Sequence, residues 1–264
     1  MSRLITECTH KTGKDDLKFH FHNDYEVIFV TEGEAELSIT GKTIIIKKGD
    51  ILFLNNNAYH NVKALKTPYN RYVATISSKA FESTFGKTNL FTLFKYNQNQ
   101  LYNSIHLPNM FELVTLFDKI IKELEKEEDT FTENLVESYL GEILVYSWRS
   151  LNSPIFIDDD IGSKISKLQR ILENNYQSNI KIQDICKDLY ISTYYLTHRF
   201  TEIIGVSPKQ YLIQIRLNHA GKLLGNKTLS IAEVAEKSGF QDTSNFIRCF
   251  KNYFGTTPNA FRNM

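Results

Sequence analysis

The sequence predicts an α+β multidomain protein, in which a small N-terminal β-barrel (jelly roll) with two helices precedes an all-α C-terminal domain. Three observations predict it. Short alternating or apolar runs separated by turn residues fill residues 19–77, helical periodicity begins near residue 108, and an internal repeat occupies residues 164–264. A chain of 264 residues is also long enough for two hydrophobic cores.

The N-terminal strands are predicted from period-two alternation and from the turn residues between them. The runs are 19–22, 27–30, 35–40, 43–46 and 51–54. The turn signals are Asn23-Asp24, Glu32-Gly33, Gly41-Lys42 and Lys48-Gly49-Asp50. Many short strands with a turn every ~10 residues indicate a barrel or jelly roll, which we place at residues 1–107.

The period changes at Pro108, and residues 108–150 are predicted to form a pair of amphipathic helices. Apolar residues recur at helical spacing within 109–125 and again within 132–149. Part of each apolar stripe is expected to pack on the barrel. Residues 151–163 are predicted to be an interdomain linker, because they combine Asn152-Ser153-Pro154 with the acidic run 158–160.

The internal repeat is the most specific feature of the C-terminal part, residues 164–264. Phe200-x4-Gly205-x2-Pro208-x2-Tyr211 recurs as Phe250-x4-Gly255-x2-Pro258-x2-Phe261, and Ile182-x2-Ile185-Cys186 matches Ile231-x2-Val234-Ala235. Ser192 and Asp242 are suitable N-cap residues for the second helix of each unit. Each unit is therefore predicted to be a helix, a tight turn and a second helix, which is the helix-turn-helix plan.

The second helices, near 193–203 and 243–253, divide into two faces. Leu196, Phe200, Phe246 and Phe250 are expected in the core. The other faces suit contacts to DNA bases, although an ordinary solvated helix face is the alternative. Two matched helices in a basic unit favour DNA recognition. The predicted DNA-binding residues are Tyr194, Thr197, His198, Arg199, Thr243, Ser244, Ile247, Arg248 and Lys251.

The net charge of +1 hides an asymmetry between the two parts of the chain. Residues 1–160 carry 17 basic against 23 acidic side chains, whereas residues 161–264 carry 14 against 7. A basic unit favours a polyanionic partner, here double-stranded DNA. Candidate phosphate contacts are Arg199, Lys209, Arg216 and Lys222.

The C-terminal pattern resembles the AraC/XylS family of bacterial regulators over about 100 residues. The resemblance is carried by ISTYYLTHRFTEIIGVSPKQYL, IRLNHAGKLL and SIAEVAEKSGFQDTSNFIRCFKNYFGTTPNAFR. It implies a sequence-specific transcription activator that works with RNA polymerase and reads two adjacent major grooves. A long helix, about Pro208 to Leu224, would join the motifs. The first motif departs from the family at Cys186, where alanine is usual, and at His198, where larger donors are common.

The N-terminal part resembles the two cupin motifs, and this implies a cupin-like barrel. The matching residues are His20-x-His22-x3-Glu26-x6-Gly33 and Gly41-x7-Gly49-x10-His60. In metal-binding cupins, the positions of His20, His22, Glu26 and His60 hold a divalent metal. Lys47 departs from the usual proline, and sensor domains of this kind often keep such residues without a metal. They then contact a ligand or belong to the strand pattern.

A small-molecule effector, a sugar or another metabolite, is expected in the barrel, because barrel mouths are common ligand sites. The candidate effector-binding residues are His20, His22, Tyr25, Glu26, His60 and Arg71. Each also has a purely structural interpretation. The leading hypothesis is thus a ligand-responsive transcription regulator without enzymatic activity. A metal-dependent cupin enzyme with an appended DNA-binding domain is the alternative, and a constitutive architectural DNA-binding protein is a third.

The remaining expectations concern assembly and location. The helix pair 108–150 is expected to form a homodimer interface, because the resemblance to the AraC/XylS family implies one there. No stretch approaches the ~20 apolar residues of a membrane helix. The three cysteines Cys8, Cys186 and Cys249 lack metal-site spacing, which fits a reduced, cytoplasmic protein.

Overall fold

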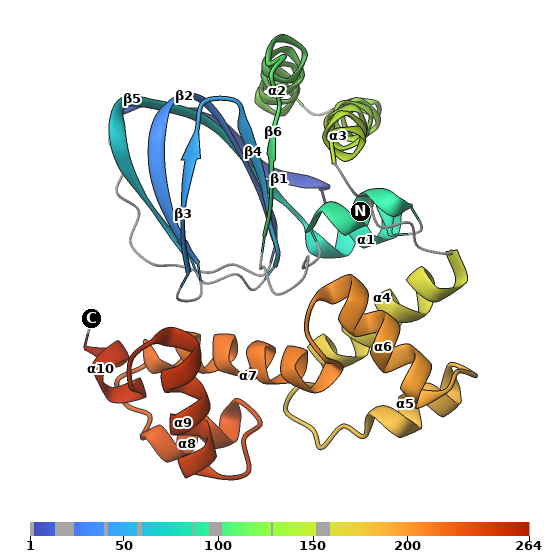
Figure 1. The fold of residues 1–264 in the computed structure, drawn as a ribbon, viewed down its shortest axis with the longest axis vertical. Helices are drawn as coiled ribbons and strands as arrows, with labels where there is room; N and C mark the ends of the chain where they lie inside the picture. Colours follow the sequence, from blue (N-terminus) through green and yellow to red (C-terminus); the bar gives the residue numbers. More distant parts are fainter. Residues whose placement is uncertain are drawn as a thin grey trace. The chain divides into compact units, whose positions relative to one another are not determined.

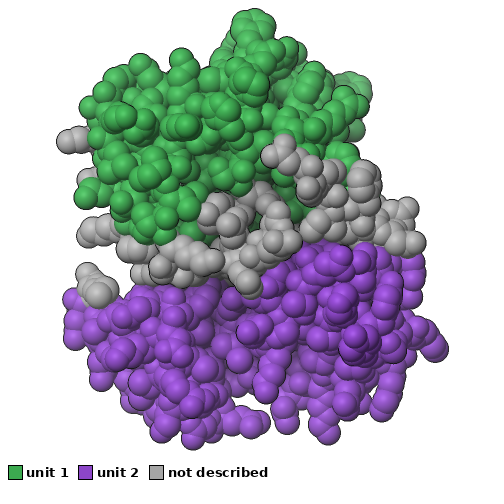
Figure 2. Space-filling model, viewed as in Figure 1, with its two compact units in different colours: residues 1–159 green, residues 160–264 purple. Residues whose placement is uncertain are grey.

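The chain forms two compact units, residues 1–159 and 160–264, in the computed structural model (Figures 1 and 2). The structure describes residues 3–13, 24–39, 42–56, 60–86, 88–94, 102–127, 129–151 and 159–263. Among these residues no helix is both long and apolar enough to cross a membrane. The division confirms the predicted class, an antiparallel β domain followed by a helical domain.

A curved, six-stranded antiparallel sheet forms the N-terminal unit (Figure 1). Its order is β1-β5-β2-β4-β6, and β3 pairs with β2. The strands are β1 (Ile5–Lys11), β2 (Tyr25–Ile39), β3 (Lys42–Lys47), β4 (Asp50–Leu54), β5 (His60–Ile76) and β6 (Tyr102–His106). The two long central strands, β2 and β5, pair along most of their length and so hold the sheet together.

The expected turn at Glu32-Gly33 is wrong, because β2 runs through it as one strand. The register against β5 shifts between Val30 and Ala35, so the chain bends there without ending the strand. Gly33 has φ of +80°, and a Cβ at this position would overlap the carbonyl oxygens of Lys66 and Pro68. A turn residue in the sequence therefore marks a bulge where the β5 backbone comes close.

Several elements of the N-terminal unit were not predicted. They are β1, β6, the helix α1 (Ser78–Phe85) and the 3-10 helix η1 (Asn89–Phe94). Among the described strands β1 pairs with β5 at the edge of the sheet, and most of its side chains are polar with Ile5 and Cys8 buried, so its composition resembles a loop. The strand expected at 19–22 lies outside the described residues.

The two predicted helices of residues 108–150 are present as α2 (Phe111–Glu125) and α3 (Thr132–Arg149). Their apolar stripes are buried at the expected spacing, with Leu113, Phe117 and Ile120 on α2. Phe117 stacks on Phe29 of β2 and on Tyr72 of β5, with ring centroids 5.8 and 5.1 Å apart. The stripe on α2 therefore packs on one face of the sheet, as predicted.

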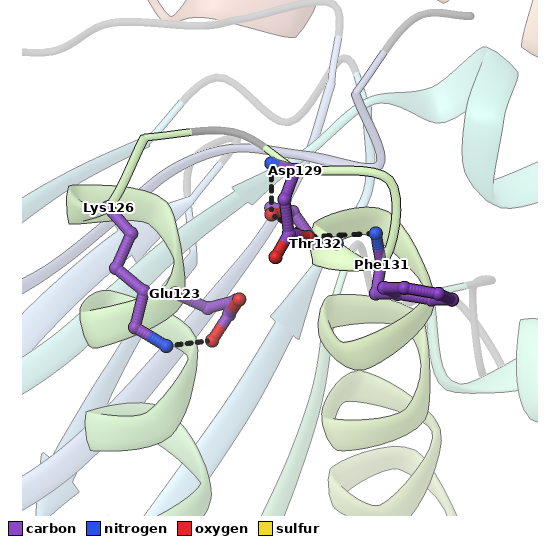
Figure 3. A network of polar contacts seen from close by, with 5 residues as sticks. All are labelled: Glu123, Lys126, Asp129, Phe131 and Thr132. Atoms are coloured by element: carbon purple, nitrogen blue, oxygen red, sulfur yellow. Dashed lines mark hydrogen bonds and ion pairs between the residues drawn. The ribbon is translucent and has the colours of Figure 1, made fainter.

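Asp129 closes the connection between α2 and α3 (Figure 3). Its Oδ1 accepts hydrogen bonds from the backbone N–H groups of Phe131 (2.8 Å) and Thr132 (2.9 Å), which lower the pKa of the carboxyl group. On the α2 side, the Nζ of Lys126 lies 2.9 Å from Glu123 Oε2. This turn leaves the Phe131 side chain 67% exposed at the start of α3.

The described part of the C-terminal unit consists of helices joined by short connections (Figure 1). They are α4 (Asp159–Asn174), α5 (Ile182–Asp188), α6 (Thr193–Ile204), α7 (Pro208–Leu224), α8 (Ile231–Lys237), α9 (Thr243–Phe254) and α10 (Pro258–Arg262). Helix α4 begins inside the range 151–163 that was predicted as linker. Ile161, Ile165 and Leu168 are buried at helical spacing, and aspartates are favourable in a first helical turn, so residues 159–163 continue the helix.

Candidate functional site

The first helix-turn-helix motif consists of α5, a four-residue turn and α6. The turn is closed by a hydrogen bond from Ile191 N–H to the carbonyl of Cys186 (3.1 Å). Ser192 caps α6 as predicted, because its Oγ accepts from Tyr195 N–H at 3.1 Å. Tyr190 takes the left-handed conformation in the turn, with φ of +52°.

The second motif, α8 and α9, repeats this geometry with one more residue in the turn. Phe240 N–H donates to the carbonyl of Ala235 (2.9 Å), the bond equivalent to the one in the first motif. Asp242 caps α9 by accepting from Asn245 N–H. Here the left-handed residue is Gly239, with φ of +90°. The repeat in the sequence is therefore a repeat in the backbone.

Both second helices end at the glycines of the internal repeat. Gly205 and Gly255 are left-handed, with φ of +82° and +73°. The chain then enters α7 and α10 at Pro208 and Pro258, each in the first turn of its helix. Because the two motifs share caps, turns and exits, α6 and α9 occupy equivalent places in their motifs.

The exposed face of α6 carries aromatic and hydroxyl side chains. Leu196 and Phe200 are fully buried, as predicted. Tyr194 is 82% exposed and its ring lies 6.2 Å from that of exposed His198. Thr197 is half-buried beside them. The face can offer a phenol, an imidazole and a hydroxyl to a partner.

The matching face of α9 is more basic. Arg248 and Lys251 are exposed, and so are Thr243 and Ser244 in the first turn. Ile247 is 38% exposed although it is apolar. The side chain of Arg248 donates to Asn245 Oδ1 at 3.0 Å, which holds the guanidinium along the helix. Guanidinium, hydroxyl and apolar groups on one exposed helix are the groups that read base edges and thymine methyls.

Arg199 and Arg216, which were expected to contact phosphate, bind other groups of the protein. The guanidinium of half-buried Arg199 forms an ion pair with Glu202 at 2.5 Å, one turn along α6. Arg216 donates from Nε to the carbonyl of Tyr176 (2.7 Å) and from a terminal nitrogen to that of Ser178 (2.9 Å). Lys209 and Lys222 are exposed. Arg216 thus holds the protein backbone, which a sequence pattern of positive charge does not show.

Helix α7 joins the two motifs over 17 residues, within the bounds that the family resemblance implies. Ser207 and Gln210 form a capping box at its start. Tyr211 is buried in α7, and its hydroxyl donates to Glu173 of α4 and accepts from Gln169. These contacts tie the connector to α4.

A second group of polar side chains is buried in the sheet of the N-terminal unit. Nε2 of His60 lies 3.0 Å from Oε2 of Glu26, and both side chains are nearly fully buried. Arg71 is 1% exposed, and its guanidinium lies 4.6 Å from the ring centroid of Tyr69. Burial raises the pKa of the Tyr69 hydroxyl. The nearby charge of Arg71 lowers this pKa and that of Glu26 raises it.

Strand register explains why Glu26, Tyr69 and Arg71 share one face of the sheet. Glu26 and Val30 lie on one face of β2, and Val30 is paired with Arg71 on β5. Tyr69 and Arg71 are two residues apart on β5 and share that face. Tyr69 was missed by the sequence analysis, although the same i, i+2 spacing that selected His20 and His22 would have selected it.

Tyr25 does not join this group. It points to the opposite face of β2 from Glu26, because neighbouring residues alternate along a strand. Its ring packs on Phe81 of α1 and Phe94 of η1, and its hydroxyl donates to Glu82. The structure therefore places Tyr25 among helices and not with Glu26, His60 and Arg71.

His20 and His22 lie outside the described residues, so the predicted set of four metal ligands is only half visible. Among the described residues no group of three or more histidine, cysteine or carboxylate side chains is arranged to hold a metal. Glu26 and His60 are the two members of the predicted set that the structure brings together.

Comparisons with known proteins find a matching family for each part of the chain. A family described as AraC-like ligand binding domain matches residues 5–144, and one described as helix-turn-helix domain matches residues 185–264. The virulence regulon transcriptional activator VirF of Shigella flexneri is 28% identical over 269 residues, which cover 97% of each chain. The Msm operon regulatory protein of Streptococcus mutans serotype c is 27% identical over 243 residues, 91% of this chain and 84% of that protein.

A solved structure of ToxT from Vibrio cholerae is similar over 99% of this chain and 98% of its own, with a TM-score of 0.58. At 19% identity this likeness shows the fold alone. Another structure of that protein has an unsaturated fatty acid bound.

Proposed function

The chain belongs to the AraC/XylS family of transcription regulators, and we propose that it is a ligand-responsive activator whose α6 and α9 bind two successive major grooves. The observation that carries the proposal is the duplicated motif, with equivalent caps, turns and exposed helix faces. A basic balance of 14 to 7 charged side chains in residues 161–264 supports binding to the phosphate backbone. The activator role follows the printed name of the relative VirF.

The length of the connector supports adjacent grooves as the target. A helix of 17 residues rises about 25 Å at ~1.5 Å per residue. With the widths of the two motifs, this matches one step of ~34 Å between successive major grooves on one face of DNA. In this proposal Tyr194, Thr197 and His198 lie in one groove. Ser244, Ile247 and Arg248 lie in the next, and Arg199, Thr243 and Lys251 flank them.

Selection from random duplex DNA tests this function. The full chain should enrich two half-sites about 10 base pairs apart, since both motifs face one side of the duplex. Binding should weaken steeply with salt, because displaced counterions accompany phosphate contacts. Enrichment of a single half-site, or of no sequence, would contradict the proposal. A reporter placed behind the enriched site then distinguishes activation, which requires RNA polymerase, from repression.

The sensor function is proposed for the polar group inside the N-terminal unit. Glu26, His60, Tyr69 and Arg71 place charged and hydroxyl groups among buried apolar side chains, which is the composition of small-molecule sites. We expect a sugar or another small metabolite to bind there, together with His20 and His22. A thermal-shift screen of such compounds tests it, because a ligand that binds only the folded state raises the melting temperature. His60→Ala should abolish the shift and leave DNA binding by α6 and α9 intact.

A metal bound by this polar group, and with it the cupin-enzyme alternative, is tested by metal analysis of the purified protein and a turnover assay. Tightly bound iron together with oxygen consumption would favour the enzyme. We propose that the protein has no reaction of its own, since the two matching families are described as a ligand binding domain and a helix-turn-helix domain. Its site of action would be the cytoplasm, where bacterial DNA lies.

Homodimerisation through α2 and α3 is also proposed. The helix pair exposes large apolar side chains to solvent, namely Phe111, Phe131, Leu135 and Tyr146. Phe111 and Phe131 are 77% and 67% exposed, which is unfavourable unless another surface covers them. Light scattering of Leu135→Asp against Glu137→Lys, an exposed charge change on the same helix, tests the interface. Only Leu135→Asp should yield monomers.

A further inference from the structure

The segment between α4 and α5, residues 175–181, lies along helix α7. Arg216 of α7 holds it by donating to the carbonyls of Tyr176 (2.7 Å) and Ser178 (2.9 Å). The ring of Tyr176 stacks on that of His219, with centroids 3.9 Å apart and planes inclined by 9°. Arg216 and His219 are three residues apart on α7, so they lie on one helix face and grip the segment together.

The same segment reaches the turn of the second motif. Nε2 of Gln177 donates to the carbonyl of Lys237, the last residue of α8, at 2.8 Å. Gly239 follows in the turn, and a Cβ there would lie 2.7 Å from Tyr176 O and 2.9 Å from Gln177 Cα. The segment is therefore packed against the backbone that leads into α9, with room for glycine alone.

The two motifs are consequently connected twice. Helix α7 is the covalent connection, and one helix alone leaves freedom to bend or rotate at its two ends. The segment 175–181 is continuous with α5 of the first motif and contacts the turn before α9 of the second. Arg216 suits this place, since its planar guanidinium can hold two carbonyl oxygens at once.

We propose that Arg216 is a positioning residue, which sets the distance and angle between α6 and α9 and hence the half-site spacing that this chain accepts. The inference rests on the proposed two-groove binding of DNA. Once the first motif is bound, binding of the second is intramolecular, and its strength depends on whether the geometry allows both to engage. A variant in which this contact is lost should bind DNA of the preferred half-site spacing more weakly, and it should tolerate altered spacings better.

The experiment uses the full chain and the duplex that the wild-type protein enriches from random DNA, with versions in which one base pair is inserted or deleted between the half-sites. Arg216→Met is compared with Arg216→Lys and with Lys227→Met, which removes the same charge from the exposed loop after α7. We expect Arg216→Met to bind the enriched duplex about tenfold more weakly than the wild type does. In this variant, inserting one base pair between the half-sites should lower the affinity only about twofold further. Arg216→Lys should restore part of the discrimination, and Lys227→Met should keep all of it.

The salt dependence separates positioning from phosphate contact. Arg216→Met should leave the salt slope unchanged, whereas loss of a phosphate contact lowers it by about one. An unchanged spacing penalty in Arg216→Met, or a lowered slope, would overturn the inference. If Arg216→Met does not fold, Gln177→Ala at an exposed position gives the same test, and its spacing penalty must fall for the inference to stand. A wild-type chain that enriches no sequence would instead remove the proposed function itself.

Discussion

The two helix-turn-helix motifs follow the same backbone path, yet the left-handed position of the turn holds a tyrosine in one and a glycine in the other. Tyr190 has φ of +52° and is 94% exposed. Gly239 has φ of +90° and is buried against the segment 175–181. The comparison shows that the turn tolerates a side chain, and that glycine is needed where another part of the chain comes within contact distance of the Cα.

The strongest test of this comparison is Gly239→Ala. We expect a loss of ~2–4 kcal/mol in the stability of the C-terminal unit, because the new Cβ is strained at positive φ and also crowds backbone atoms that cannot move cheaply. Denaturant unfolding followed by circular dichroism would measure it. The matched control is Gly255→Ala, where φ is +73° but no atom lies within 4 Å, and where we expect only ~1 kcal/mol. Equal losses at the two glycines would show that close approach plays no part.

The second test compares the exposed faces of α6 and α9. Arg248→Ala should reduce affinity for the enriched duplex by ~1–3 kcal/mol and affinity for random DNA by much less, as expected for a bidentate contact to guanine. His198→Ala, at a matched place in the first motif, should lose less, because imidazole makes a weaker single contact. Competition gel shifts against random DNA give both values. A parallel loss on both kinds of DNA would make Arg248 a phosphate contact.

A smaller effect is expected when the tyrosine turn is made to match the glycine turn. Tyr190→Gly relieves the strain of a left-handed non-glycine residue but gives the unfolded chain more freedom. The two terms oppose each other, so we expect a change within ~1 kcal/mol, of stabilising sign. Differential scanning calorimetry of the full chain would detect it. A clear destabilisation would show that the exposed ring of Tyr190 has a packing role.

The smallest expected effect is on the pH dependence of stability, through the contact that the segment 175–181 makes with α7. Burial, and then the charge of Lys222, lowers the pKa of His219, which stacks on Tyr176. A histidine with a lowered folded pKa favours folding above its unfolded pKa of 6.5, and this contribution is lost as pH falls below that value. The melting temperature should therefore drop more between pH 7.5 and 5.5 in the wild type than in His219→Gln. An equal drop would remove His219 from the pH response.

The duplicated motif could be predicted almost completely from the sequence. Its caps, glycines and apolar positions act within one or two helical turns, so Ser192, Asp242, Gly205 and Gly255 take the places that local rules assign to them. In the N-terminal unit the same rules found the strand runs at 27–30, 35–40, 43–46 and 51–54 and the periodicity of α2 and α3. They did not find β1, whose polar residues become a strand only through pairing with β5.

What only the tertiary structure decided is which distant groups meet. The charge of Arg216 indicated a phosphate contact, but its partners are carbonyls 40 and 38 residues earlier in the chain. Glycine at 33 indicated a turn, but the approach of β5 makes it a bulge within β2. Tyr25 and Glu26 are adjacent in the sequence, and both were candidate effector-binding residues. Tyr25 packs instead on α1 and η1, which lie on the opposite face of β2 from Glu26. Local hydrogen bonds and hydrophobic periodicity are determined by residues close together in the sequence, whereas long-range contacts depend on how completed elements pack.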